Sequence, residues 1–304
     1  MSIRHRPYRD STDDRQLLEL LSDFNATHPE YGFLQPGDLT WWTRQNTTFD
    51  PHESLRIFET TDGLPVGFVF NDPPTWAAVQ AHPYLEPSAL DEMILYAESV
   101  AARSAAAEET RLTVRVFGGD RPTRNALQQR GYTETGTASL VFERFLPVNQ
   151  SLIVDRPGVQ VRAVRETAED LEARVALHRA VWRPSRFTLG SYLRLRASPA
   201  YRPELDLIVE VEGAMAAYAL GWFDSRTGVG LFEPVGTHPD HRGGGLATLV
   251  LREMLSRFQA LGGTRALVST SPSNDGAVRL YQAVGFQVYG RYLDFVSPII
   301  QPLS

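Results

Sequence analysis

Two residue types are missing from this chain of 304 residues, cysteine and lysine. Without cysteine there is no disulfide bond, no thiolate ligand for a metal and no cysteine nucleophile. Without lysine there is no Schiff base on a lysine amine, which excludes a pyridoxal phosphate enzyme of the usual kind. All 30 cationic side chains are arginines. We attribute this mainly to coding bias, because arginine and lysine replace each other on most exposed surfaces.

Long apolar runs are also missing. No stretch of 18 apolar residues occurs, and the first residues contain no signal-peptide apolar region, so we expect a cytoplasmic protein without a membrane span. The formal net charge of −6 argues against non-specific nucleic-acid binding and mildly favours a cationic or amine substrate. The length suggests two domains, each able to bury a core.

The chain between residues 230 and 261 predicts a strand, a glycine loop and a helix in that order. The strand covers 230–237, three glycines follow at 243–245, and the helix has apolar residues on one face at 247, 250, 251, 254, 258 and 261. Glycines let the backbone approach a ligand, and the free amides of a first helical turn attract an anion. Leu246 stands where a Walker loop needs lysine, and Thr248 where a dinucleotide fingerprint needs glycine or alanine.

The loop fits a different pattern, Arg-x-x-Gly-x-Ala, at Arg242, Gly245 and Ala247. It resembles the pyrophosphate loop of the GNAT superfamily of N-acetyltransferases. A second block, residues 274–286, is similar to the family pattern Asn-x-x-Ala-x-x-Leu-Tyr-x-x-x-Gly-Phe at every marked position. The resemblance implies acetyl-CoA as co-substrate. The residues implied in binding it are Val235, Gly236, Thr237, Arg242, Gly243, Gly244, Gly245, Leu246, Ala247, Thr248, Asn274 and Tyr281.

Landmarks in the two halves of the chain repeat at a nearly fixed offset. Gly213 minus Gly63 gives 150, Pro239 minus Pro83 gives 156, and Gly285 minus Gly131 gives 154. Matching landmarks in matching order indicate an internal duplication. We predict an α/β (α+β) fold of two tandem GNAT domains, each a mixed, mostly antiparallel, twisted sheet flanked by helices. The predicted domains are 1–150 and 151–304, joined near 146–158.

The two halves differ in their chemistry. After His82-Pro83 the first half has no glycine, carries the acid Glu86, and has Pro87, which lacks an amide proton. Leu127 stands at the position that corresponds to Tyr281, since 281 − 154 = 127. We therefore predict a degenerate first domain and a catalytic second domain.

The resemblance implies that Tyr281 lies near the thioester sulfur. A phenol stays protonated at neutral pH and can donate to the departing thiolate, so we predict Tyr281 as the general acid. Glu233 is the predicted base for the acceptor ammonium, because strand alternation places it on one face with 235 and 237. The amides near Val235 to Thr237 would hold the acetyl carbonyl. Each of these residues also has a structural alternative: buried packing for Tyr281, a solvated charge for Glu233 and a helix N-cap for Asn274.

The turn at His238, Asp240 and His241 matches no established metal site, and we expect no metal. The sequence predicts an acyl-CoA-dependent N-acetyltransferase that acts by direct attack on a small-molecule or peptide primary amine. It would be a monomer or homodimer without a nucleic-acid or membrane partner. Two alternatives are a non-catalytic CoA-binding or regulatory module and acetyl transfer to a hydroxyl. The candidate residues for the acceptor wall are Trp182, Arg183, Arg186, Phe187, Tyr192, Tyr218 and Trp222. Core packing explains the aromatic ones at least as well.

Overall fold

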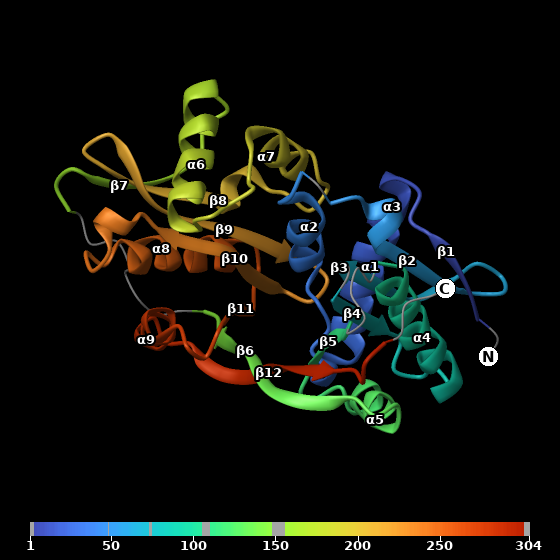
Figure 1. Ribbon diagram of the computed structural model, residues 1–304. Coiled ribbons are helices and arrows are strands. Elements are labelled where there is room, and N and C mark those ends of the chain that lie inside the picture. The colour runs from blue at the N-terminus through green and yellow to red at the C-terminus, as the bar shows by residue number, and fades with distance from the viewer. Residues whose placement is uncertain (1–2, 48, 73–74, 105–109, 148–155, 301–304) are drawn as a thin grey trace. The chain divides into compact units, whose positions relative to one another are not determined.

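The computed structural model describes residues 3–47, 49–72, 75–104, 110–147 and 156–300. Its internal contacts divide the chain into two compact units. Both units combine a mostly antiparallel sheet with helices, as the sequence predicted (Figure 1). Unit 1 is Met1–Leu34, Asp50–Leu140 and Gly290–Ser304, and unit 2 is Gln35–Phe49 and Val141–Tyr289.

Unit 1 is built on strands in the order β1-β2-β3-β4-β5-β12. Neighbouring strands are antiparallel except β4 and β5, which are parallel. The strands are β1 (Ile3–Pro7), β2 (Leu55–Thr60), β3 (Pro65–Asp72), β4 (Trp76–Ala81), β5 (Thr113–Phe117) and β12 (Gln287–Val296). The helices are α1 (Ser11–Thr27), η1 (Pro29–Tyr31), α3 (Pro51–Ser54), α4 (Pro87–Ser104) and α5 (Arg121–Gln129).

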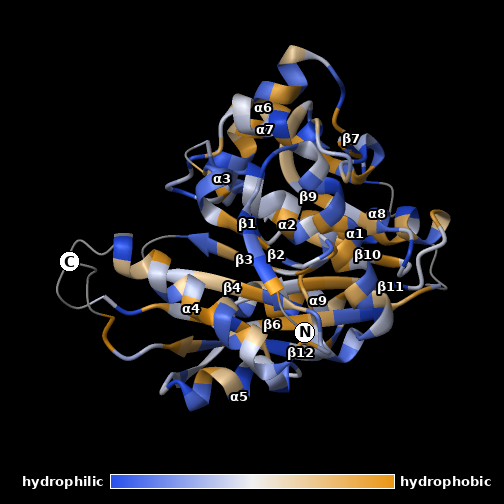
Figure 2. Cartoon of the chain, turned by 90° about the vertical axis from the view of Figure 1, so that its right-hand side faces the viewer, coloured by the Kyte–Doolittle hydropathy of each residue, from blue (hydrophilic) through white to orange (hydrophobic). Residues whose placement is uncertain are grey.

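The hydrophobic core of unit 1 lies between its sheet and helix α4. Helix α4 alternates apolar and polar residues along its length (Figure 2). Its apolar side chains Met93, Ile94 and Ala97 are buried in one cluster with Phe58 and Val79 of the sheet. The amphipathic pattern thus fixes the face of α4 that meets the strands.

Unit 2 orders its strands as β11-β10-β9-β8-β7. Only the β10–β11 pair is parallel among these neighbours. The strands are β7 (Val159–Ala163), β8 (Asp206–Val211), β9 (Ala214–Asp224), β10 (Val229–Thr237) and β11 (Arg265–Thr270). The helices are α2 (Pro36–Arg44), α6 (Ala168–Val181), α7 (Leu189–Arg196), η2 (Pro203–Leu205), η3 (Pro239–His241), α8 (Leu246–Ala260) and α9 (Asp275–Ala283).

Helix α8 is seated on β9 and β10 at two glycines. A Cβ atom at Gly230 would lie 2.3 Å from the Phe258 ring, and one at Gly221 would lie 2.4 Å from the Met254 sulfur. Both α8 side chains are fully buried. The helix therefore approaches the strands closely, which fixes the position of its N-terminus and of the glycine loop before it.

Segments of each half of the sequence belong to the unit formed mainly by the other half. Strand β12 closes the second half but pairs with β5 in unit 1, where Tyr292 lies opposite Phe117. Helix α2 comes from the first half and belongs to unit 2. Strand β6 (Thr133–Phe145) and strand β12 both have residues in the two units. The predicted boundary at 150/151 follows chain order, unlike the two units; it remains a prediction, and residues 148–155 lie outside the described part of the chain.

A buried ion pair crosses the core of unit 2. Arg174 of α6 donates to Asp206 of β8 at 3.1 Å, and both side chains have at most 1% of their surface exposed. Asp206 also accepts hydrogen bonds from the hydroxyls of Tyr192 and Tyr201. The arginine lies over the Tyr218 ring at 3.7 Å. The carboxylate thus compensates the charge of a fully desolvated guanidinium.

We expect Asp206→Ala to lower the free energy of unfolding by about 3 to 5 kcal/mol, because it leaves the buried Arg174 charge without its partner. Glu204→Ala is the matched control. It removes the carboxylate of a surface pair with Arg202 in which the Glu204 side chain is 48% exposed, and it should cost less than about 1 kcal/mol. Urea unfolding followed by tryptophan fluorescence measures both. Equal losses would show that the Arg174–Asp206 pair contributes no more than a surface pair.

Among the described residues, the structure contains no helix that is both long enough and apolar enough to span a bilayer.

Candidate active site

The predicted anion loop connects β10 to α8 (Figure 1). Gly243 and Gly245 have φ angles of +80° and +74°, a region that favours glycine. Gly245 is the N-cap of α8. The Arg242 guanidinium donates to the Thr237 carbonyl at 3.4 Å, and Arg156 donates to the Gly244 carbonyl at 2.6 Å. The loop is thus an exposed turn held from both sides by arginine.

Backbone donors of this loop are free. The first helical bond at this end runs from the Leu249 amide to the Gly245 carbonyl. Within the described part of the chain, the amides of residues 243–248 donate to no acceptor. Three of these amides belong to the first turn of a helix of 15 residues, where the helix dipole adds positive potential. The predicted residues from Gly243 to Thr248 thus form one continuous row of donors suited to a phosphate ester.

Strands β10 and β11 separate before they end. Their parallel pairing covers only Val229–Phe232 of β10, which continues to Thr237. The register of β10 with β9 also shifts between Phe232 and Val235, where Pro234 has no amide proton to donate to the ladder. The structure therefore leaves the last residues of β10 unpaired on the side that faces β11.

Two amides of β10 point into this separation. The His238 amide donates to the Ala216 carbonyl of β9 at 2.8 Å. Successive residues of an antiparallel strand direct their amides to opposite sides. The amides of Val235 and Thr237 therefore point away from β9, and that of Gly236 points toward it. Two of the three predicted carbonyl-binding amides are thus turned to the open side of the strand.

Glu233 lies at the bulge of β10 and is half-buried. Desolvation, with a further contribution from the charge of Asp38, raises the pKa of Glu233 to about 8. Asp38 belongs to α2, and burial raises its pKa to about 7 although it accepts a hydrogen bond from the Gln35 amide at 2.8 Å. At neutral pH a carboxyl of this kind exchanges protons readily, which suits a general base.

Tyr281 projects from α9 into the same part of unit 2. It is buried at 5% exposure and contacts the rings of Phe142 and Phe286. Burial and the charge of Glu233 raise the pKa of Tyr281, so the phenol stays protonated. The hydroxyl has no hydrogen-bond partner among the described residues, and it is not a fully buried atom. The structure therefore brings the two predicted catalytic residues within electrostatic reach of each other.

Asn274 caps helix α9. Its side chain accepts a hydrogen bond from the Ala277 amide at 3.2 Å, and the residue is exposed. The structural alternative for this residue is thus confirmed. The predicted contact with the cofactor stays a prediction. Among the described residues no group of three histidine, aspartate or glutamate side chains is arranged to hold a metal, and the turn at His238 to His241 is open to solvent.

Most of the aromatic residues expected near the acceptor are core residues. Phe187, Tyr192, Tyr218 and Trp222 are buried, whereas Trp182 is 47% exposed. The Trp182 indole donates to the Tyr218 hydroxyl at 2.7 Å, and this hydroxyl lies 2.8 Å from His178 Nδ1. Desolvation lowers the pKa of His178 to about 3, so the imidazole is neutral. These contacts link α6 and its C-cap residue to β9 by hydrogen bonds.

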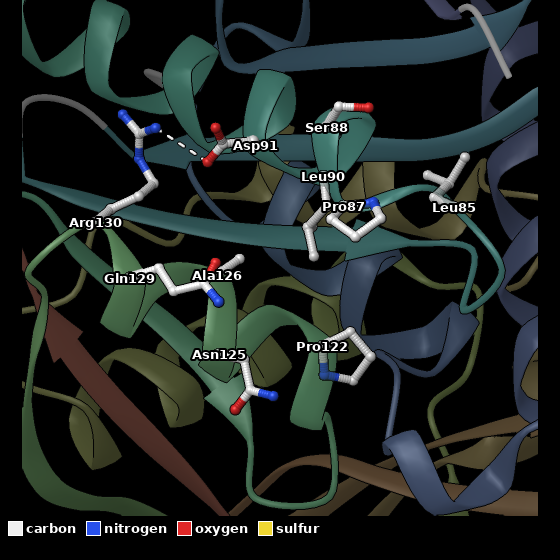
Figure 3. A pocket seen from close by; sticks show the side chains of 10 residues that line it. All are labelled: Leu85, Pro87, Ser88, Leu90, Asp91, Pro122, Asn125, Ala126, Gln129 and Arg130. Carbon is white, nitrogen blue, oxygen red and sulfur yellow. Dashed lines mark hydrogen bonds and ion pairs between the residues drawn. The ribbon is translucent and has the colours of Figure 1, made fainter.

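A cavity of about 690 Å³ occupies the corresponding place in unit 1, between the start of α4 and α5 (Figure 3). Pro87 at its rim has no amide proton to offer. Arg130, the cavity's only arginine among the described residues, donates to Asp91 and to Glu98. Its charge is thus already compensated, and the cavity offers no donor row like residues 243–248.

The comparisons with known proteins agree with this geometry. Residues 172–286 match the model of the acetyltransferase (GNAT) family. The match covers β10, the glycine loop, α8 and α9. This segment of the chain, 115 of its 304 residues, is similar to the GNAT family of acetyltransferases. The predicted recognition is therefore confirmed, and the matched segment contains every predicted site residue.

Individual relatives of this chain are distant. An acetyltransferase of Yersinia enterocolitica is 28% identical over 85 residues, which are 28% of this chain and 59% of that protein. A tandem GNAT protein from the clavulanic acid biosynthesis pathway has a TM-score of 0.69 at 15% identity, over 100% of both chains. A GCN5-related N-acetyltransferase from Sphaerobacter thermophilus has a TM-score of 0.66 at 18% identity, covering 99% of this chain and 97% of that one. At these low identities, the two structures show the fold alone.

Two residues of the site escaped the sequence analysis. Asp38 lies more than 190 positions before Glu233 in the chain. Arg156 lies before β7 and outside both family blocks. No local motif points to either residue, because only the tertiary fold brings them to the site.

Proposed function

We propose that this protein transfers the acetyl group of acetyl-CoA to a primary amine, with the chemistry in unit 2. The observation that carries the proposal is the row of free amides at residues 243–248, at the N-terminus of α8. This row would bind the pyrophosphate of CoA. The open side of β10 at Val235 and Thr237 would hold the acetyl carbonyl, and the negative charge that develops on its oxygen.

Each proton transferred in the proposed reaction has a donor and an acceptor group. Glu233 takes one proton from the acceptor ammonium, and the neutral nitrogen attacks the thioester carbon. The C–N bond forms, the C–S bond breaks, and the thiolate takes the Tyr281 proton. The second proton of the nitrogen returns to the phenolate. The products are an amide, the CoA thiol and one proton on Glu233, which passes to water.

The N-terminal half contributes no cofactor site in this proposal. Arg130 is compensated by acids, and Pro87 begins α4 without an amide proton. A cytoplasmic location and a small-molecule or peptide acceptor belong to the same proposal.

The proposal is tested by calorimetry with acetyl-CoA, followed by a CoA-release screen against amines, matched alcohols and peptide N-termini. We expect binding of one acetyl-CoA per chain and faster CoA release with an amine, with the acetyl group found on nitrogen. A chain that does not bind acetyl-CoA, or that acetylates only hydroxyls, would contradict the proposal.

The rate of CoA release should rise with pH to a midpoint near 8. Below this pH Glu233 is protonated and cannot take the ammonium proton, because its pKa is raised to about 8. The measurement is a pH profile of kcat/KM for the best amine. In the Glu233→Gln variant the rise of kcat/KM near pH 8 should be absent, and CoA should be released at least about tenfold more slowly. An unchanged profile in the variant would remove Glu233 from the role of base.

A further inference from the structure

The first half of the sequence supplies a helix to the catalytic unit. Helix α2 belongs to unit 2, and in Figure 1 it lies beside α7. A Cβ atom at Gly37 would lie 2.3 Å from Trp222 Cγ of β9, so the helix backbone rests directly on this ring. The Trp222 indole in turn donates to the Glu233 carbonyl at 2.7 Å. Asp38, the next residue of α2, is thereby held next to the bulge of β10.

The side chain of Trp41 fixes the same helix from its other end. It is 4% exposed and lies in one buried cluster with Trp222, Phe187 and Leu231. Its ring centroid is 5.5 Å from that of Phe187 and 5.5 Å from that of His178. The position of Asp38 is thus determined by packing on both sides, and not by a mobile loop.

The two carboxylates have no counter-ion in the described part of the chain. Neither Asp38 nor Glu233 forms an ion pair there, and the only hydrogen bond to either carboxylate comes from the Gln35 amide. Each is half-buried, and the two interact closely enough for the charge of Asp38 to raise the pKa of Glu233. Two partly desolvated acids without a neighbouring cation favour the binding of a positively charged ligand.

Other titratable groups around the pair supply no positive charge. Tyr281 of α9 and Tyr218 of β9 both interact with Glu233, and burial raises the pKa of each phenol, so both are neutral. His178 of α6 is neutral as well. The charge of Arg174 is taken up by Asp206. These groups therefore give the pair no counter-charge, and a cationic ligand would meet no competing counter-ion among them.

We propose that Asp38 is a specificity-determining residue, which together with Glu233 selects an acceptor that arrives as an alkylammonium ion. This deepens the proposed function and rests on it. The acceptor's N–H groups donate to both carboxylates, one proton passes to Glu233, and the free amine is left facing the open side of β10. Alcohols and arylamines, which are neutral at pH 7, gain nothing from a pair of acids. The N-terminal half thus contributes to acceptor choice without a cofactor site of its own.

The test measures the carboxyl groups directly, in the full-length protein with ¹³C-labelled aspartate and glutamate side chains. Glu233 is assigned by the loss of its signal in Glu233→Gln. In Asp38→Asn the NMR titration midpoint of Glu233 should fall by about 0.5 to 1 pH unit, because the neighbouring negative charge is gone. Asparagine can still accept from the Gln35 amide, so the helix cap is kept.

Asp120→Asn is the matched control. Asp120 of unit 1 also caps a helix through its side chain, and burial also raises its pKa. Its removal should leave the Glu233 midpoint unchanged. A role of Asp38 in structure alone would lower stability without moving this midpoint. An identical Glu233 midpoint in wild type and Asp38→Asn would overturn the proposal.

A second measurement uses n-butylammonium chloride and n-butanol as probes of equal size, at constant ionic strength. The ammonium should lower the titration midpoints of both carboxyls in the wild type, and its effect should be at least about threefold weaker in Asp38→Asn. Butanol should change neither midpoint. Equal effects of the two probes would also overturn the inference. Because neither measurement requires acetyl-CoA, failure of the proposed function is seen separately, in calorimetry and CoA release.

Discussion

Tyr281→Phe should slow CoA release at least about tenfold while acetyl-CoA binding stays as in the wild type. A positioned general acid contributes about 10²- to 10⁴-fold to a proton-transfer step. The Tyr281 hydroxyl makes no hydrogen bond within the described chain, so its removal breaks no internal contact. The ring still fills its site against Phe142 and Phe286. The loss should therefore appear in kcat and not in the Kd of acetyl-CoA.

Tyr132→Phe is the control for this experiment. Tyr132 follows α5 in unit 1, is also buried, and also has a raised pKa, here through burial and the charge of Glu98. It donates to Glu98 at 3.1 Å, so the substitution loses a real hydrogen bond remote from the proposed chemistry. Turnover should be unchanged in Tyr132→Phe. Equal turnover in Tyr281→Phe and the wild type would exclude Tyr281 as the acid.

Local sequence was enough to predict the parts of the site that lie within one segment of chain. The glycine loop and the face of β10 that carries Glu233 follow from neighbours within about a dozen residues, because turn geometry and strand alternation are local properties. Tyr281 was singled out by the resemblance of residues 274–286 to the GNAT pattern. The burial pattern of β10 matches the predicted alternation, since 233, 235 and 237 are half-buried and 234 and 236 are buried.

The exchange of α2 and β12 between the two halves of the chain could not be predicted from local sequence. Helix α2 and strand β12 look in the sequence like ordinary elements of their own half, and their periodicity reveals only that one face is apolar. Which core receives that face is decided by shape, as where Gly37 lets the helix approach Trp222. The pairing of Asp38 with Glu233 depends on that contact. These two acids are so far apart in sequence that no motif spacing predicts their proximity.

A negative charge in the glycine loop should abolish most cofactor binding. Gly244→Glu is the chosen change, because Gly244 does not have a positive φ, unlike its two neighbours. A Cβ atom there would meet the His241 carbonyl at 3.5 Å and Leu246 Cγ at 4.0 Å, which are ordinary contacts. The backbone can thus keep its path while a carboxylate is placed beside the free amides of residues 243–248. This copies the acid that Glu86 puts before α4 in the first half.

We expect calorimetry to show at least about a tenfold larger Kd for acetyl-CoA in Gly244→Glu. Repulsion between a carboxylate and a pyrophosphate a few ångströms apart exceeds about 1.4 kcal/mol at a partly desolvated surface. Gly244→Gln has the same size without the charge and should bind much more tightly than Gly244→Glu, so the pair separates electrostatics from crowding. The difference should shrink as salt is added, since the loop is exposed. If both variants bind like the wild type, the phosphates do not lie at this loop, and the cofactor site must be sought elsewhere in the chain.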